Sequence, residues 1–267
     1  MQAATTATPS FGALLRQWRE RRKLSQLALA LDANVSTKHV SFVESGRTTP
    51  SREMVLTLAD VLALPLRAQN ALLLSAGYAP IYPLHAIDDP ALSVARRAVD
   101  LVLKGHEPYP AIAIDRHWNL VAANRAFDFF STGLPELLLA PPTNVLRASL
   151  HPEGLAARIE NLTEWRAHAL RHLHHQVEAS GDPVLAALYE ELGGAMTAPS
   201  PNEHSVLVAQ LRVREPSGRG VLSFISTTTM FGTPIDVTMS ELAIESFFPA
   251  DDATAAALHQ RARDRQP

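Results

Sequence analysis

The chain of 267 residues contains no cysteine. That absence excludes disulfide bonds, thiolate catalysis and metal sites held by cysteine, and it fits the reducing conditions of the cytoplasm. The sequence also lacks the run of about 18 apolar residues that a membrane span requires. The N-terminus, MQAATTATPS, has no basic segment followed by an apolar stretch and so does not resemble a secretion signal. We therefore expect a cytoplasmic protein without membrane contact.

Catalytic motifs are also missing. The sequence has no G-x-S-x-G, no H-E-x-x-H and no glycine-rich loop of the kind that holds phosphate. Acidic residues such as Glu190 and Glu191 are typical of exposed helix positions. These observations predict neither an enzyme nor a bound cofactor.

A cluster of histidines is the one candidate for a metal site. His168, His172 and His175 are spaced so that a helix places them on one side. Two neutral imidazoles at such a spacing can bind zinc or nickel. However, the three flank the apolar stripe of that helix, and the neighbouring Arg171 disfavours a cation. A solvated helix face is the expected role, and we predict no metal.

Charge is distributed unevenly along the chain. The net charge is −3, yet residues 1–79 contain nine Lys or Arg against five Asp or Glu, and the rest contains 15 against 22. The length favours two domains, and the apolar content of 46% is enough for a core. A basic head on an acidic body is expected when only the head contacts nucleic acid.

Residues 25–51, SQLALALDANVSTKHVSFVESGRTTPS, predict two short helices joined by a tight turn, with a third about to start. Ser25 and Ser36 each precede an apolar-periodic run, as helix N-caps do. Asn34 lies at the turn and tolerates a left-handed backbone. The apolar residues that the first two helices share form one wedge: Leu29, Ala30, Ala33, Val35, Val40 and Val43.

The second helix of this pair has a polar outer face, which suits the major groove of DNA. Thr37, Lys38 and Ser41 are the expected contacts with base edges. Phe42 either touches a thymine methyl or packs on the neighbouring helix, and His39 either contacts DNA or caps its own helix. The complete expected DNA-binding set is Gln26, Ser36, Thr37, Lys38, His39, Ser41, Phe42, Arg47 and Thr48, with Gln26, Arg47 and Thr48 at the phosphate backbone.

These motifs resemble a known family. SQxxLA, NVS and VSFVESGRTTPS are similar to Xre/Cro-type helix-turn-helix regulators, and HVSFVESGR, PSREMVLTLADVL and NALLLSAGYAPIY are similar to the MmyB-like subfamily. The resemblance is strong over residues 10–83 and fainter to about 250, and Asn34 replaces the more common glycine of the turn. It implies a DNA-binding head on a PAS-like domain that binds apolar small molecules, fatty-acid-like ones among them. It also implies a link between Arg16 and Glu44, as the alternative to a phosphate contact by Arg16.

The remaining segments complete the expected domain organisation. A disordered segment, 1–9, precedes a five-helix head at 10–79. The core of the head is completed by Leu72, Leu73 and Leu74. Prolines in 78–90 predict a stiff linker, followed by a helix from about Ala91 to Lys104. The face of that helix that packs on the second domain or on a second copy contains Val94, Ala98, Leu101 and Val102. Linker and helix together occupy 80–107.

From Tyr109 the periodicity predicts strands. A hairpin of 111–114 and 119–123, followed by a short helix with three phenylalanines, resembles the opening of a PAS domain. The middle predicts one long helix, 155–179, and a second at 183–193. Strands in 205–214, 220–229 and 235–248 complete an antiparallel sheet of about five strands. The PAS-like domain is thus 108–250, and 251–267 is a tail, read as a frayed helix.

The predicted fold is therefore multidomain: an all-α five-helix head followed by an α+β PAS-like domain with an antiparallel sheet. A sheet covered by helices leaves an apolar cavity between the layers. For each candidate lining residue, core packing is the alternative. The candidates are Trp118, Asn124, Phe127, Phe130, Leu146, Trp165, Phe224, Thr228 and Phe231, with Asn124 and Thr228 as polar fixing points.

These features predict a sequence-specific transcriptional regulator whose C-terminal domain senses an apolar small molecule. One head makes few phosphate contacts and one groove insertion, so a homodimer on a two-fold site in double-stranded DNA is expected. The alternative is a C-terminal domain that serves protein interaction or dimerisation without a ligand. A more distant alternative is an enzyme controlled by DNA.

Overall fold

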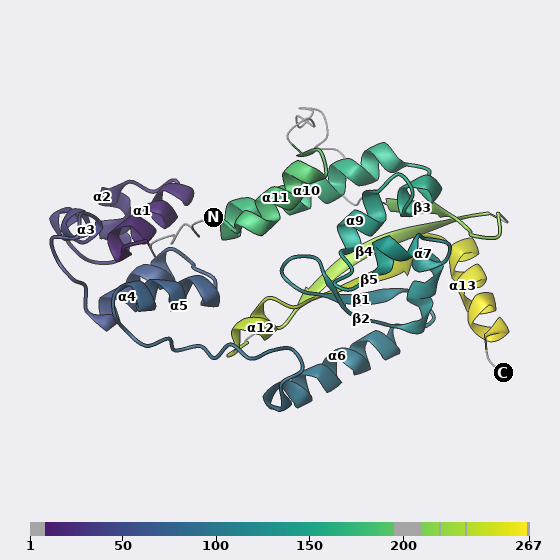
Figure 1. The fold of residues 1–267 in the computed structure, drawn as a ribbon, viewed down its shortest axis with the longest axis horizontal. Coiled ribbons are helices and arrows are strands. Elements are labelled where there is room, and N and C mark those ends of the chain that lie inside the picture. Colours follow the sequence, from purple (N-terminus) through teal and green to yellow (C-terminus); the bar gives the residue numbers. More distant parts are fainter. Residues whose placement is uncertain (1–8, 195–209, 219, 233, 266–267) are drawn as a thin grey trace, which may run out of the picture. The chain divides into compact units, whose positions relative to one another are not determined.

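The computed structural model describes residues 9–194, 210–218, 220–232 and 234–265, and the chain divides into two compact units (Figure 1). One unit is Met1–Leu84 with Ile235–Val237, and the other is His85–Pro234 with Thr238–Pro267. The segment predicted to be disordered, 1–9, lies almost entirely outside the described residues. None of the described helices is long and apolar enough to cross a membrane.

The first unit contains the five expected helices. They are α1 (Phe11–Arg21), α2 (Gln26–Asp32), α3 (Thr37–Glu44), α4 (Arg52–Val61) and α5 (Leu66–Ser75). Ser10, Ser25, Ser36 and Ser51 cap the first four, because each hydroxyl accepts a backbone N–H three residues ahead. The short spacings between these serines therefore set where each helix begins.

The turn between α2 and α3 forms as the sequence predicts. Asn34 adopts a left-handed backbone with φ +53°, and the apolar wedge is buried, with Val35 packed against it. Gly12 lets α1 approach α3 closely, since a Cβ there would stand 2.3 Å from the Glu44 carbonyl oxygen. One core prediction is wrong: Leu74 is 59% exposed, because three consecutive helical residues cannot all face inward.

The helix after the linker packs on the second domain through a different face from the predicted one, whose alternative partner was a second copy. α6 (Ser93–Gly105) follows a short turn, η1 (Pro90–Leu92), and packs on the sheet through Val99 and Leu103. Val94, Leu101 and Val102 are instead 81%, 65% and 47% exposed. The helix has two apolar faces, and periodicity alone does not show which one the sheet covers.

The second unit is built on an antiparallel sheet of five strands in the order β2-β1-β5-β4-β3 (Figure 1). This confirms the predicted fold class. The strands are β1 (Ala111–Ile114), β2 (Leu120–Ala123), β3 (Gln210–Arg214), β4 (Val221–Met230) and β5 (Ala243–Pro249). One face carries α6 over small side chains such as Ala111 and Ala113. The other face carries the helices of the middle segment.

That middle segment is more broken than expected. Its elements are η2 (Arg125–Phe127), α7 (Asp128–Ser131), α8 (Glu136–Leu139), α9 (Val145–Leu150), η3 (Leu155–Arg158), α10 (Leu162–Ser180) and α11 (Pro183–Glu191). The predicted helix 155–179 is interrupted, because the backbone of Ile159 leaves the helix and pairs with Val213 of β3. Leu162 then starts α10, whose Ala169 and Leu173 face the core.

Two predictions at the C-terminal end are also wrong. The segment 235–248 begins with a short helix, α12 (Val237–Ser240), before β5. The tail is helical, as predicted, but α13 (Asp252–Asp264) packs on β4 and β5, with Thr254 1% and Leu258 3% exposed. It is therefore part of the domain. The first part of the predicted strand 205–214 lies outside the described residues.

Candidate DNA-binding face and ligand cavity

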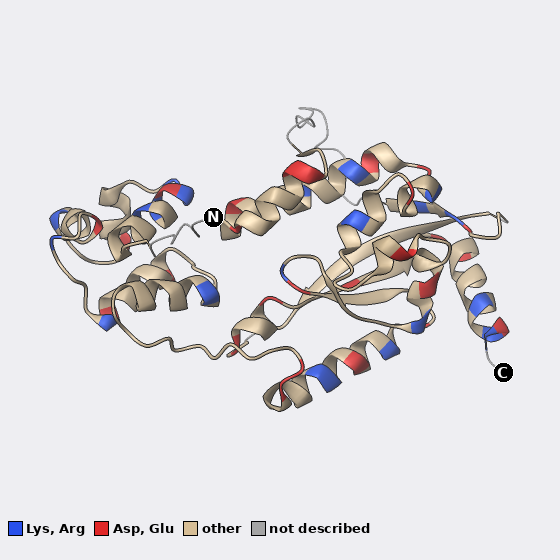
Figure 2. Cartoon of the chain, viewed as in Figure 1, with Lys and Arg blue, Asp and Glu red and all other residues tan. Residues whose placement is uncertain are grey.

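The outer side of α3 exposes the residues predicted to reach DNA. Lys38 is exposed, and Thr37, Ser41 and Phe42 are half-buried. The Lys38 Nζ lies 5.4 Å and the Arg47 Cζ 5.6 Å from the centre of the Phe42 ring. Phe42 thus lies between two cations and outside the hydrophobic core of the head. In the first unit, ribbon segments of basic residues lie on α1, α3 and the loop after α3 (Figure 2).

The loop after α3 returns onto the end of that helix. Gly46 has φ +71°, and the Arg47 N–H donates to the Phe42 carbonyl at 2.8 Å. The Thr48 N–H donates to the same carbonyl at 3.3 Å. These bonds hold the exposed side chains of Arg47 and Thr48 beside the end of α3.

Ser36, and not the side chain of His39, caps α3. The Ser36 hydroxyl accepts the His39 N–H at 3.1 Å, so Ser36 caps α3 and the His39 side chain does not. The His39 Nε2 is buried and has no hydrogen-bond partner among the described residues. That ring nitrogen therefore faces inward, away from the surface that a groove would meet.

A buried ion pair fixes α3 to α1 and α2, and its arginine is not the one expected. Arg19 donates from Nε to Glu44 Oε1 at 2.6 Å and from Nη2 to Oε2 at 3.0 Å, and Gln26 Nε2 donates to Oε2 at 2.8 Å. Arg16 instead pairs with Glu20 at 2.7 Å, which corrects the Arg16–Glu44 expectation. The hydrogen bond to Glu44 raises the pKa of Arg19. Gln26 therefore has one amide N–H bound to Glu44.

The second unit encloses a cavity of about 600 Å³ between the sheet and α10, within the usual size of ligand sites. Six of the nine predicted lining residues surround it: Trp118, Phe127, Phe130, Leu146, Trp165 and Thr228.

The other three predicted lining residues lie elsewhere. Phe224 is fully buried and packs against Phe130, so it is core. The Asn124 side chain accepts from the Ala111 N–H and donates to the carbonyls of Leu103 and Tyr109, which makes it a structural link. Phe231 packs with the α6 cluster on the opposite face of the sheet.

The histidines of α10 line the cavity, which corrects the prediction of a solvated face. His168 and His172 are half-buried, while Arg171 and His175 are exposed at the same wall. Burial lowers the pKa of His168, with smaller contributions from His172 and Arg171, and burial and His175 lower that of His172. Both imidazoles are therefore neutral near pH 7. No three His, Asp or Glu side chains of the described residues are grouped to hold a metal.

Glu245 is another lining residue that the sequence analysis did not predict. It lies on β5, opposite Ile112 of β1 and Thr228 of β4, and is 7% exposed. The Thr228 hydroxyl donates to its Oε1 at 2.6 Å. Burial raises the pKa of Glu245 in spite of that hydrogen bond. The sequence did contain a signal for this position. Side chains alternate along a strand, so Glu245 lies on the same face as the apolar Phe247, and Ile244 and Ser246 lie on the other.

Comparisons with known families identify both parts of the chain. Residues 10–72 match the family described as helix-turn-helix domain, and residues 95–260 match the MmyB-like transcription regulator ligand binding domain. The second match covers more than half of the chain. The chain belongs to the family of MmyB-like transcription regulators. It is a DNA-binding transcriptional regulator with a ligand-binding domain. No curated protein matches the sequence significantly.

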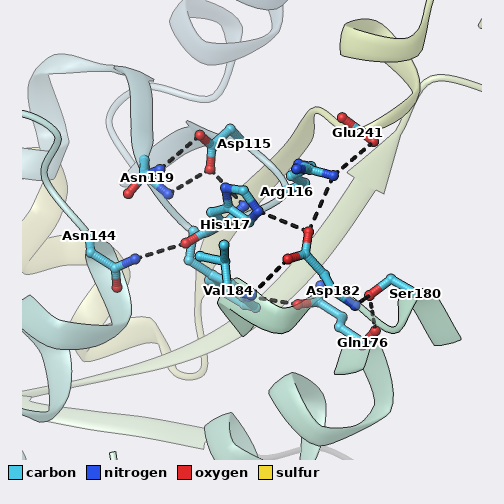
Figure 3. Close-up of polar contacts among 11 residues, drawn as sticks. Asp115, Arg116, His117, Asn119, Asn144, Gln176, Ser180, Asp182, Val184 and Glu241 are labelled. Atoms are coloured by element: carbon cyan, nitrogen blue, oxygen red, sulfur yellow. Dashed lines mark hydrogen bonds and ion pairs between the residues drawn. The ribbon is translucent and has the colours of Figure 1, made fainter. Parts of the chain in front are cut away.

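In this MmyB-like regulator, a polar network holds the β1–β2 turn, which carries the cavity-lining Trp118 (Figure 3). Trp118 adopts φ +65° in the β1–β2 turn, an uncommon backbone for a bulky residue, and its indole N–H donates to Gln176 at 2.6 Å. The turn is held because Asp115 Oδ1 accepts the N–H groups of His117 and Asn119 at 2.8 and 2.9 Å. The Trp118 ring is thereby directed at α10.

Asp182, the N-cap of α11, is the centre of this network. Its Oδ2 lies 2.9 Å from His117 Nε2 and 3.2 Å from Arg116 Nη1, and Arg116 also lies 3.7 Å from Glu241 (Figure 3). Burial alone would raise the pKa of Asp182, but hydrogen bonds from His117 and Val184 and the charge of Arg116 lower it overall. Through Arg116 and Glu241, the network joins the β1–β2 turn to the β4–β5 connection.

Proposed function

We propose that this regulator binds a two-fold DNA operator as a homodimer, and that an apolar ligand in the cavity changes that binding. The observation that carries the DNA part is the exposed face of α3, on which Lys38, Phe42 and Arg47 lie together beside a capped helix start. The observation that carries the ligand part is the cavity between sheet and α10. The regulator acts in the cytoplasm and has no catalytic role.

On DNA, α3 enters the major groove with its N-terminal half. Thr37, Lys38 and Ser41 read base edges, because hydroxyl and ammonium groups match the donors and acceptors there. The ring of Phe42 contacts a thymine methyl. Arg47 and Thr48 hold the phosphate backbone, together with Ser36 and the second amide N–H of Gln26, whereas the inward-facing ring nitrogen of His39 makes no contact.

The homodimer follows from the size of one head. A single α3 reads few base pairs, whereas two heads related by a two-fold axis read two half-sites with summed contacts. A palindromic operator is the corresponding DNA symmetry.

The ligand is fatty-acid-like in having a long apolar body. Four aromatic side chains of the cavity wall, Trp118, Phe127, Phe130 and Trp165, suit such a body. Its binding favours one arrangement of the protein over another, by no more than its difference in affinity for the two.

The route from ligand to DNA runs through the β4–β5 connection. A ligand that displaces Trp118 moves the turn that carries Arg116, and Arg116 contacts Glu241. Ile235–Val237, in the same connection, group with the first unit, where the Val237 N–H donates to the Pro83 carbonyl at 2.9 Å. A shift near the cavity is thereby transmitted to the linker of the head.

The DNA part is tested on a site selected from random DNA by the wild-type chain. The double variant Thr37→Ala, Lys38→Ala should bind that site at least tenfold more weakly, since a good base contact is worth about 1–3 kcal/mol. Binding to unrelated DNA should fall much less. Lys104→Ala, exposed in the other unit, is the control. Equal losses on both DNAs would show that α3 does not read bases, and wild-type affinity should also fall steeply with salt.

The coupling is tested with Arg116→Gln. Ligand affinity should stay within about twofold, while the effect of ligand on operator affinity should shrink, because the link to Glu241 is lost. Arg212→Gln, which breaks an exposed pair with Glu160, is the matched control. If Arg116→Gln leaves the ligand effect intact, the proposed route is wrong.

A further inference from the structure

We infer that the cavity selects a ligand whose apolar body carries an uncharged hydrogen-bonding head group, and that Glu245 and Thr228 bind this head. The inference rests on the proposed ligand-binding function of the cavity. It adds the chemistry that distinguishes one apolar ligand from another.

The first support is a polar patch on an otherwise apolar wall. The cavity face of the sheet presents Ile112, Leu211 and Phe247, which are apolar. Among them lie Ser226, Thr228 and Glu245 on neighbouring strands, and Thr228 is paired in register with Glu245. A buried acid costs stability, so its position against the cavity calls for a partner from outside the chain.

The second support is the incomplete hydrogen bonding of Glu245. Thr228 donates to Oε1, and no other hydrogen bond or ion pair to this carboxyl exists among the described residues. Within the described part of the chain, no cation contributes to the pKa of Glu245, whereas burial raises it. The second carboxyl oxygen, Oε2, is therefore available to a ligand, and it is an O–H donor when the carboxyl is protonated.

The third support is the opposite wall. His168 and His172 of α10 face the cavity as neutral imidazoles, each with one donor and one acceptor nitrogen. Their rings are held by aromatic contacts, with His168 5.5 Å from Trp165 and His172 5.3 Å from Trp118 between ring centres. A head group between the two walls therefore meets hydrogen-bonding groups without charge.

Charge decides the class of head. A carboxylate head group at this patch would approach the buried carboxyl of Glu245. The two would repel each other unless Glu245 stayed protonated. An alcohol or amide accepts from the Glu245 O–H and donates to an imidazole nitrogen without such a cost. Arg171 and His175, the basic groups of the same wall, are exposed rather than buried beside Glu245.

The experiment compares four probes with one tail: dodecan-1-ol, dodecanamide, dodecanoate and dodecylamine. Binding to the full chain is followed by tryptophan fluorescence, because two of the three tryptophans line the cavity. We expect the alcohol and the amide to bind about tenfold more tightly than dodecanoate, the value of one good hydrogen bond. Glu245→Leu should abolish that preference, and Glu245→Gln should largely keep it.

Two further variants separate recognition from folding. Thr228→Val keeps the shape of the side chain but removes the hydroxyl, and it should weaken the preference about threefold. Glu178→Gln, exposed on α10, should bind every probe as the wild type does. All variants are first shown to melt cooperatively.

Three results would overturn the inference. Tightest binding of dodecylamine, lost in Glu245→Gln, would show an ion pair. If dodecanoate binds most tightly and Glu245→Leu has no effect, the head group of the ligand binds elsewhere, and the ligand-binding function stands. No binding of any probe to the wild-type chain would instead contradict the proposed ligand-binding function itself.

Discussion

Glu44 of the head and Glu245 of the ligand-binding domain are both buried acids, but they differ in their partners. The Glu44 side chain is 4% exposed and accepts from Arg19 and Gln26, which come from two other helices. Glu245 is 7% exposed and accepts only the Thr228 hydroxyl among the described residues. The head thus uses burial of charge to join its elements, and the second domain keeps a buried polar group free.

The interiors of the two units show the same difference. The core of the head is filled by residues such as Leu15, Leu29 and Leu72, and its functional face is the outside of α3. The second unit leaves about 600 Å³ open inside. One unit therefore presents function on its surface, and the other in its interior. The predictions below test this contrast.

Removal of Arg19 should have the largest effect. Among the described residues, Arg19→Met leaves Gln26 as the only side-chain partner of the buried Glu44 carboxylate, which should cost the head about 3–5 kcal/mol. The measurement is urea unfolding followed by circular dichroism. Arg16→Met, which breaks the exposed pair with Glu20, should have no measurable effect. Equal stability of the two variants would show that the buried pair does not hold the head together.

Glycine substitutions should give effects of opposite sign in the two units. Gly12→Ala should destabilise the head by about 1–3 kcal/mol, because its Cβ meets the Glu44 carbonyl and α1 must move away from α3. Gly105→Ala at the end of α6 meets no atom within 4 Å and should be neutral or stabilise by up to about 1 kcal/mol. Thermal unfolding of both variants is the measurement. A neutral Gly12→Ala would contradict the close helix contact.

The smallest effect concerns pH and Glu245. Its pKa in the folded protein is raised above the ordinary 4.5, so the wild type should lose stability as pH rises from that value through the raised pKa. Glu245→Gln cannot ionise and should lack this loss, becoming relatively more stable toward alkaline pH. Urea unfolding of both proteins at several pH values measures it. Parallel curves would show that Glu245 is not an unpaired buried acid.

Arg19 and Glu44 show the limit of sequence reasoning in the head. The resemblance implied Arg16 as the partner of Glu44, but Arg16 and Arg19 lie three residues apart on α1 and share a face. In the fold, Arg19 reaches Glu44, and Arg16 pairs one turn ahead on its own helix. Packing of α1 on α3 made that choice.

The cavity shows the limit in the second unit. Trp118, Phe130 and Trp165 were predictable as lining because they are large apolar residues within the expected PAS-like domain. Glu245 and the histidines of α10 were not, since a polar residue beside an apolar stripe is as consistent with solvent as with a cavity. The same ambiguity between solvent and core applied to the faces of α6, because its apolar Val94 and Leu101 are exposed.

The sequence by itself determined the helix starts of the head, the left-handed turn at Asn34, the antiparallel strands and the separation of basic from acidic halves. These depend on hydrogen bonds and backbone preferences within a few residues. Only the tertiary structure decided which helix faces are covered, which arginine binds Glu44 and which polar side chains line the cavity. Those outcomes depend on contacts between residues far apart in the chain, whose packing no local pattern specifies.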